Sequence, residues 1–321
     1  MSHRIEQMAY TGAAPWHKLG SELPANQPIE VWAEKAGMNW EIKDTPVCFQ
    51  THGVDGKQVH PFQDQRVLFR SDSLQPLSVV GSRYQVVQPM EVLEFYRDLT
   101  EVSGFQLETA GVLKGGKKFW ALARTGQSAA LKGSDLVNGY VLLATSCDGT
   151  LATTATPTTV RVVCSNTLSI ALRDMSEGIR VSHSTAFDAQ TVKRRLGIAV
   201  SQWEEFMYRM KALSERKIKL KESEQFFSKL FQIRQEQTTP VEATGQDRAV
   251  KKLLQLYSGH GRGAEMGAAK NTAWGLLCAV TEFVDHERRA RSNDHRLDSA
   301  WFGQGAVLKQ RALESSLQLL A

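Results

Sequence analysis

The sequence predicts an α+β fold, in which an antiparallel β-hairpin core is followed by a helical C-terminal region. Segments 104–125 and 138–163 each alternate apolar and polar residues around a glycine-containing turn. After Phe187 the apolar residues recur at helical spacing instead, and strands and helices do not alternate along the chain. We therefore expect a β-rich α+β core domain over residues 1–186, and a helical region over 187–321 that packs on the core or on a neighbouring subunit.

The first hundred residues are rich in turns, with short apolar runs at 66–70 and 77–81. One helix is expected among them, over 88–102. Its apolar residues recur at i, i+3, i+4 and i+7, and it should end before Gly104. Those residues are Val92, Phe95, Tyr96 and Leu99.

Two hairpins should follow this helix. The first turns at Gly115–Gly116 and the second at Asp148–Gly149, where glycine supplies the positive φ that tight turns need. Pro157 should mark an edge, a bulge or a break between strands, because proline cannot donate to a ladder. Asn166 and Thr167 can cap a helix over 168–173.

The remaining chain should be helical. Helices are expected over 188–217, 222–234, 247–258, 272–291 and 305–320, with a linker at 238–246 and a glycine-rich loop at 258–267. That loop lacks the residue pattern of a nucleotide-phosphate loop, so we expect no bound nucleotide.

The composition is that of a soluble protein, with a net charge of +5 and a pI near 9.0. No apolar run approaches the roughly 18 residues of a membrane span, and the first residues show no secretion signal. The cysteines are far apart along the chain, which disfavours zinc and disulfides and favours a cytoplasmic protein without cofactors. They are Cys48, Cys147, Cys164 and Cys278.

The strongest nucleic-acid pattern is the first hairpin turn. Lys114, Lys117 and Lys118 surround it, and Phe119 and Trp120 follow directly. Lysines neutralise phosphates, and an outward-facing ring stacks on a base. The alternative is an ordinary polar turn in which one of the two rings enters the core by alternation.

Arg161 stands inside a β-branched run, and an arginine there usually serves a carboxylate, a phosphate or a nucleotide backbone. Cys164 lacks a nearby base and is expected to be structural. His17 fits a base or a surface hydrogen bond equally well. Further cations that we expect to contact DNA are Arg83, Lys193, Arg194, Arg195 and Lys270. For Lys270, at the start of a predicted helix, a capped loop is the alternative.

Segment 282–298 holds carboxylates and histidines among arginines: Glu282, Asp285, His286, His295 and Asp298. Glu282 and His286 share a helix face, yet the pattern lacks the spacing of a zinc protease site. We expect a salt-bridge network that joins the last helices, with no metal. A metal-dependent nuclease is therefore the third functional choice.

Six segments resemble the phage/plasmid-like protein family in their order and spacing. They are AYTGAAPWHKLG, VVGSRYQVVQ, ETAGVLKGGKKFWALA, TPTTVRVVCSNTLSIAL, TAWGLLCAVTEFVDHERR and RLDSAWFGQGAVLKQRAL. The resemblance covers nearly the whole chain and implies a habitat in phages, prophages and conjugative plasmids. It implies no reaction, so it assigns no catalytic residue.

The order of two hairpins and a helix is similar to the β-β-β-α core of single-strand annealing proteins, of the RecT/Red-beta and eukaryotic recombination-mediator kinds. Those proteins assemble into rings or filaments around a basic DNA groove. We therefore expect a non-enzymatic, ATP-independent, homo-oligomeric protein that binds and anneals single-stranded DNA. The alternative is a protein-directed inhibitor of a host defence or repair factor.

Overall fold

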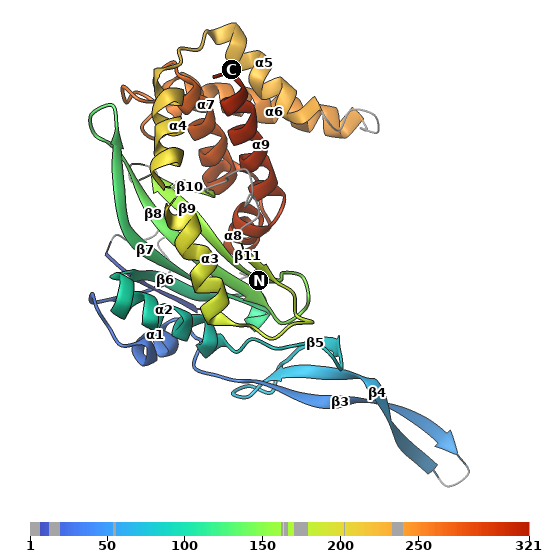
Figure 1. The fold of residues 1–321 in the computed structure, drawn as a ribbon. Helices are drawn as coiled ribbons and strands as arrows, with labels where there is room; N and C mark the ends of the chain where they lie inside the picture. The colour runs from blue at the N-terminus through green and yellow to red at the C-terminus, as the bar shows by residue number, and fades with distance from the viewer. Residues whose placement is uncertain are drawn as a thin grey trace. The chain divides into compact units, whose positions relative to one another are not determined.

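The computed structural model describes residues 7–12, 20–53, 56–161, 163, 166–169, 179–201, 203–232 and 240–320. It has the predicted α+β fold, with antiparallel strands and C-terminal helices (Figure 1). The chain forms two compact units. Unit 1 comprises residues 1–126, 141–156 and 177–197, and unit 2 comprises residues 127–140, 157–176 and 198–321. The chain thus enters each unit several times, whereas we expected a single division near residue 187.

The described strands form two sheets. The larger has the order β10-β9-β8-β7-β6-β1-β2, with β11 also pairing with β9, and the smaller has the order β3-β4-β5. Their bounds are β1 Gln7–Thr11, β2 Ser21–Leu23, β3 Ile42–Gly53, β4 Gly56–Arg70, β5 Pro76–Gly81, β6 Gln106–Leu113, β7 Lys118–Leu131, β8 Asp135–Ser146, β9 Thr153–Arg161, β10 Asn166–Ser169 and β11 Ile179–Val181.

The described helices are concentrated in the second half of the chain. Their bounds are α1 Ile29–Lys35, α2 Pro89–Ser103, α3 Ala189–Ser201, α4 Trp203–Glu215, α5 Leu220–Gln232, α6 Pro240–Gln255, α7 Ala273–Glu282, α8 Asn293–Phe302 and α9 Gln304–Gln318. Short π-helical turns follow α6 at Leu256–His260 and α7 at Phe283–Glu287. No helix among the described residues is long and apolar enough to cross a membrane.

Helix α2 confirms the predicted helix and both of its ends. Proline is favoured in a first turn because its fixed φ suits a helix, and Pro89 occupies that place. The backbone N–H of Gln88 donates to the Glu91 carboxylate at 2.6 Å, which completes a capping box. Gly104 ends the helix with a φ of 68°, in the left-handed region that glycine adopts without strain.

Both predicted hairpin turns are confirmed. Strands β6 and β7 pair antiparallel across Lys114–Gly116, where Gly115 and Gly116 have φ values of 68° and 92°. Gly149, with a φ of 73°, lies in the turn between β8 and β9, which are neighbours in the sheet. Local turn chemistry was therefore sufficient to place these hairpins.

Pro157 does not divide the chain into two strands, because β9 runs through it from Thr153 to Arg161. On one edge of β9, residues 158–161 pair with β10 and residues 153–155 pair with β11. Pro157 lies between the two partners, where its missing N–H removes no ladder bond.

The predicted helix cap at Asn166 and Thr167 is wrong. These residues begin β10 and pair with Arg161 and Val160 of β9. The ladder of a neighbouring strand therefore overrides the local capping preference. The rest of the expected helix, like His17 and Cys164, lies outside the described residues.

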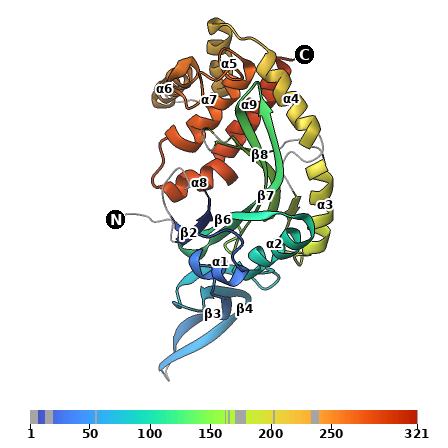
Figure 2. The same ribbon diagram turned by 90° about the vertical axis from the view of Figure 1, so that its left-hand side faces the viewer.

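The helical region follows the predicted order, with one further correction. Residues 240–246 were expected in a linker, yet α6 already begins at Pro240, a residue that a first helical turn tolerates. The apolar faces of the helices of unit 2 enclose a core that includes Phe206, Phe227 and Trp274. Helices α7 and α9 lie side by side within this unit (Figure 2).

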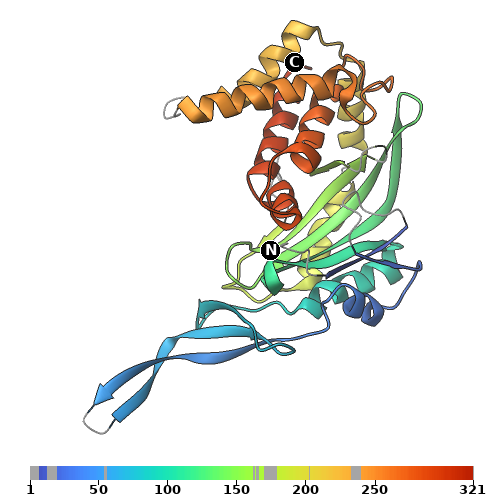
Figure 3. The same cartoon turned by 180° about the vertical axis from the view of Figure 1, so that it is seen from behind.

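Unit 1 contains a long two-stranded ribbon that sequence patterning did not reveal. Strands β3 and β4 pair over their whole length, and β5 accompanies only residues 65–69 of β4. The ribbon extends from helices α1 and α2 of the same unit (Figure 3). Phe49, Val59 and Phe62 are exposed on its distal part.

Candidate nucleic-acid interface

The lysines of the first hairpin turn are less accessible than predicted. Lys114 and Lys117 are half-buried, and Lys118 is buried. Lys114 adopts a φ of 55°, so the backbone of the turn is left-handed at three successive residues. This turn therefore offers two partly accessible cations.

The prediction that one of the two adjacent rings faces solvent is wrong. Trp120 is 2% exposed and Phe119 is fully buried. Trp40 packs edge-on against Phe119 at 6.2 Å, and the Tyr96 hydroxyl of α2 donates to the Ala121 carbonyl at 3.0 Å. Because both faces of β7 are covered here, strand alternation places both rings in the interior, and Trp120 offers no face to a base.

Arg161 serves a carboxylate, which was one of its predicted partners. Its Nε donates to Asp135 Oδ1 at 2.7 Å and its Nη2 to Asp135 Oδ2 at 2.8 Å, and both side chains are buried. The Trp274 indole N–H donates to the same carboxylate at 3.1 Å. Arg161 is only 3% exposed, so the expected contact with DNA is not supported.

The glycine-rich loop is fastened by buried charges of the same unit. Arg161 donates to the Gly263 carbonyl at 3.0 Å, and the Arg262 backbone N–H donates to a Glu282 carboxylate oxygen at 2.9 Å. Burial raises the pKa of Glu282, although the Arg262 backbone N–H acts in the opposite direction. Arg161 and Glu282 therefore hold the loop in place.

The predicted acidic cluster is also divided among structural partners. Asp285 accepts from Lys309 Nζ at 2.9 Å, and both side chains are nearly buried. His286 lies in the π-helical turn after α7, and Asp298 lies within α8. Within the described residues, no group of three or more side chains has the composition to hold a metal ion.

The remaining predicted cations differ in environment. Arg83 is exposed, and Arg194 is exposed with its Nη2 donating to Thr191 at 2.9 Å. Lys193 Nζ lies 5.4 Å from the centre of the Phe95 ring. Lys270 is exposed and pairs with Glu265. Arg195 lies in α3, and its side chain is outside the described part.

Unit 2 holds a denser group of cations around the connection of α4 to α5. Five cations and one carboxylate occur between residues 211 and 221. Four exposed lysines form what we call the lysine turn: Lys211, Lys217, Lys219 and Lys221. Glu222, the nearest acid of α5, accepts the Lys219 backbone N–H at 3.0 Å and Arg216 at 2.9 Å, and these bonds lower its pKa.

Backbone hydrogen bonds join the lysine turn to the segment that directly follows Lys270. The Ile218 N–H donates to the Asn271 carbonyl at 3.0 Å, and the Ala273 N–H donates to the Arg216 carbonyl at 2.9 Å. Lys217 pairs with Thr272, whose hydroxyl caps α7. Lys270, a predicted DNA contact, therefore precedes a segment that pairs with the lysine turn within unit 2.

An exposed aromatic ring accompanies this turn. Tyr208 is 76% exposed on α4, and Lys211 follows three residues later on the same helix. Residues three apart are neighbours on a helical surface, so Tyr208 and Lys211 occupy adjacent positions on the outside of α4. Phe206, Met207 and Met210 are buried, so the helical period places Tyr208 on the outer face of α4. The spacing of these apolar residues in the sequence could have predicted this exposure.

The comparisons with known proteins identify a family without an assigned activity. The family described as a domain of unknown function, DUF932, matches residues 76–301, which include α2, the hairpins, the lysine turn and the Arg161 network. No curated protein matches the chain, and no solved structure matches it either. Because the match spans more than half of the chain, this protein belongs to the DUF932 family.

Proposed function

We propose that this protein binds single-stranded DNA and anneals complementary strands, without ATP and as a homo-oligomer. The observation that carries the proposal is the lysine turn with Tyr208. It combines exposed ammonium groups, which neutralise phosphates, with an exposed ring, which stacks on any base. This is the chemistry that the sequence suggested for 114–120, located instead on α4 and α5.

A structural explanation accounts for only part of the lysine turn. Lys211 lies in the last turns of α4, where a cation offsets the helix dipole. Lys219 and Lys221 instead stand at the start of α5, where the dipole disfavours cations. These two lysines therefore destabilise the start of α5, and a phosphate bound to them would offset that destabilisation.

The wider setting also supports annealing. Strands β6 to β9 are followed by the short strands β10 and β11 and then by α3. This succession of antiparallel strands before a helix is similar to the β-β-β-α core of annealing proteins, and the motifs resemble a family of phages and plasmids. Mobile elements of both kinds pass through single-stranded DNA. A homo-oligomer in the cytoplasm is part of the same proposal.

A salt titration tests DNA binding. Four lysine–phosphate contacts predict an affinity that falls about fiftyfold between 50 and 200 mM salt, from a slope of about −0.7 for each contact with a single strand. Binding of a labelled oligonucleotide should follow this slope with no nucleotide added. Absence of binding at low salt, or binding indifferent to salt, would overturn the proposal. Electron-microscope images with and without DNA test for rings or filaments.

The ribbon of β3 and β4 supports a second candidate function, inhibition of a host defence or repair factor. Phe49 and Phe62 are exposed on one face of the ribbon, because they pair with His60 and Val47 of the opposite strands. Neighbouring exposed apolar side chains are typical of protein-binding surfaces. Between residues 45 and 65 the only lysine or arginine is Lys57, so this surface is poorly suited to DNA. A pull-down that captures one stoichiometric host protein through Phe49 and Phe62, and no DNA, would favour this function.

A further inference from the structure

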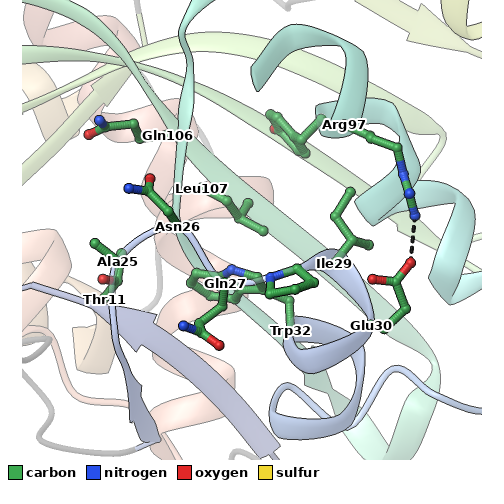
Figure 4. Close-up of a pocket in the computed structure, with 12 residues that line it drawn as sticks. Thr11, Ala25, Asn26, Gln27, Ile29, Glu30, Trp32, Arg97, Gln106 and Leu107 are labelled. Atoms are coloured by element: carbon green, nitrogen blue, oxygen red, sulfur yellow. Dashed lines mark hydrogen bonds and ion pairs between the residues drawn. The ribbon is translucent and has the colours of Figure 1, made fainter. Parts of the chain in front are cut away.

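Unit 1 contains a pocket of about 320 Å³ that the sequence did not reveal (Figure 4). Its lining comes from the end of β1, the loop before α1, α1 itself, α2 and the start of β6. The volume is at the lower end of the range of roughly 300 to 1,000 Å³ for small-molecule sites. The pocket therefore has room for one ring system.

The pocket offers three primary amides. Asn26, Gln27 and Gln106 line it, where Asn26 and Gln106 are exposed and Gln27 is partly buried. Each amide carries two N–H donors and a carbonyl acceptor. Figure 4 shows the amides of Asn26 and Gln106 on one side of the pocket and the amide of Gln27 pointing away from them. A ligand that presents donors and acceptors along one edge would therefore bond to Asn26 and Gln106.

The remaining lining is apolar or internally neutralised. Ile29, Trp32 and Leu107 form the apolar part. The two charged lining residues are Glu30 and Arg97, which bind each other at 2.8 Å, and Arg97 also donates to Glu94 at 2.8 Å. With its charges paired, this pocket favours a neutral ligand over a phosphate or a carboxylate.

The loop that carries two of the amides is constrained by its sequence. Pro24 and Pro28 flank it, and proline fixes φ on both sides. Asn26 has a φ of 60°, which asparagine tolerates better than most residues. The backbone that carries Asn26 and Gln27 is thus constrained before a ligand binds, which reduces the entropy cost of binding.

We propose that this amide pocket, formed by Asn26, Gln27 and Gln106 over Ile29, Trp32 and Leu107, receives one unstacked base of a bound single strand. A base is neutral and flat, and its edge carries the donors and acceptors that asparagine and glutamine recognise. The inference rests on the proposed function and assigns a base-dependent contact to unit 1.

The test compares an ordinary single strand with one in which abasic spacers replace every base. The full chain should bind the ordinary strand more tightly, by about fivefold for each hydrogen bond to a base. The variant Asn26→Gly with Gln106→Ala should lose much of this preference while its affinity for the spacer strand stays unchanged. Glycine is chosen at position 26 because it adopts a positive φ without strain.

The matched control is Gln50→Ala with Gln58→Ala, which removes two exposed amides of the ribbon in the same unit. It should behave as the unchanged protein. A pocket variant that still discriminates fully between the strands would overturn the inference and leave DNA binding intact. If neither strand binds, the proposed function fails. Saturation-transfer NMR with free deoxynucleosides then tests the pocket alone, and a signal that the pocket variant does not reduce would overturn it.

Discussion

Arg161 and the lysine turn are both basic features of unit 2, yet they lie in opposite environments. Arg161 is buried and bound to Asp135 at 2.7 and 2.8 Å. Lys217, Lys219 and Lys221 are exposed, and the nearby Glu222 is engaged by Arg216 and a backbone N–H. A buried cation requires an internal carboxylate, because desolvation without a partner is costly. An exposed cation keeps its hydration and can exchange it for a phosphate.

The comparison predicts opposite consequences for substitution. Removing a partner of a buried cation should destabilise the fold, whereas removing an exposed lysine should leave the fold intact and weaken DNA binding. The following changes test this contrast.

The largest effect is expected for Asp135→Ala. It removes the carboxylate that both Arg161 nitrogens bind and deprives the Trp274 N–H of its acceptor. The free energy of unfolding should fall by about 3 to 5 kcal/mol, measured by urea titration. Asp135→Leu combined with Arg161→Met should recover part of that loss. A decrease below about 1 kcal/mol in Asp135→Ala would show that the pair does not need its carboxylate.

A second buried pair sharpens the contrast within the helices. Lys309→Met removes the buried ion pair with Asp285, and the free energy of unfolding measured in urea should fall by about 3 kcal/mol. The matched control is Lys252→Met, because Lys252 binds Glu287 at the same 2.9 Å but both side chains are partly exposed. That change should cost about 1 kcal/mol or less. Equal losses for the two variants would argue against burial as the deciding variable.

Tyr208→Ala should leave stability nearly unchanged and weaken single-strand binding. Stacking of a base on an aromatic side chain contributes about 1 to 3 kcal/mol, so the dissociation constant should rise by about fivefold or more. Tyr208→Phe keeps the ring and should retain binding. Leu220→Ala, at another exposed apolar residue near the turn, serves as the control. If Tyr208→Ala binds as tightly as the unchanged protein, the ring has no part in DNA binding.

The smallest effect concerns pH and Glu282. Its pKa is raised above the ordinary 4.5, chiefly by burial, so the folded state holds the proton more tightly than the unfolded state. Its contribution to stability is therefore greatest below pH 4.5 and falls as pH rises through the raised pKa. Glu282→Gln lacks this titration. The free energy of unfolding of the variant, relative to that of the unchanged protein, should therefore increase as pH rises from 4.5. A relative decrease over the same pH range would contradict burial as the main cause.

Features set by neighbouring residues were predictable from the sequence. Gly115, Gly116 and Gly149, which adopt a positive φ, predicted the hairpin turns. The helical spacing of apolar residues and the glycine at 104 predicted α2 and its end. Features that depend on a distant partner were not. Asn166 and Thr167 carry a capping pattern, but pairing with β9 decides their conformation.

The candidate site shows the same limit. Residue types alone favoured the hairpin lysines and Trp120 over the lysine turn as a DNA-binding surface. They could not show that Trp120 is buried, because its exposure depends on which segments cover β7. Arg161 signalled a partner, but Asp135 is 26 residues away in sequence and was not identifiable. The amide pocket combines segments near 11, 26, 97 and 106, so no local pattern could disclose it.

The salt dependence of single-strand binding in a lysine-turn variant tests the central claim most directly. Lys217, Lys219 and Lys221 are replaced together by alanine, and exposed lysines elsewhere, Lys43, Lys57 and Lys251, are replaced in a control of equal charge. Our account predicts that the lysine-turn variant binds more weakly at low salt, and that the slope of log affinity against log salt becomes shallower by about 2. The control should keep the original slope. Equal slopes for both variants would contradict the account.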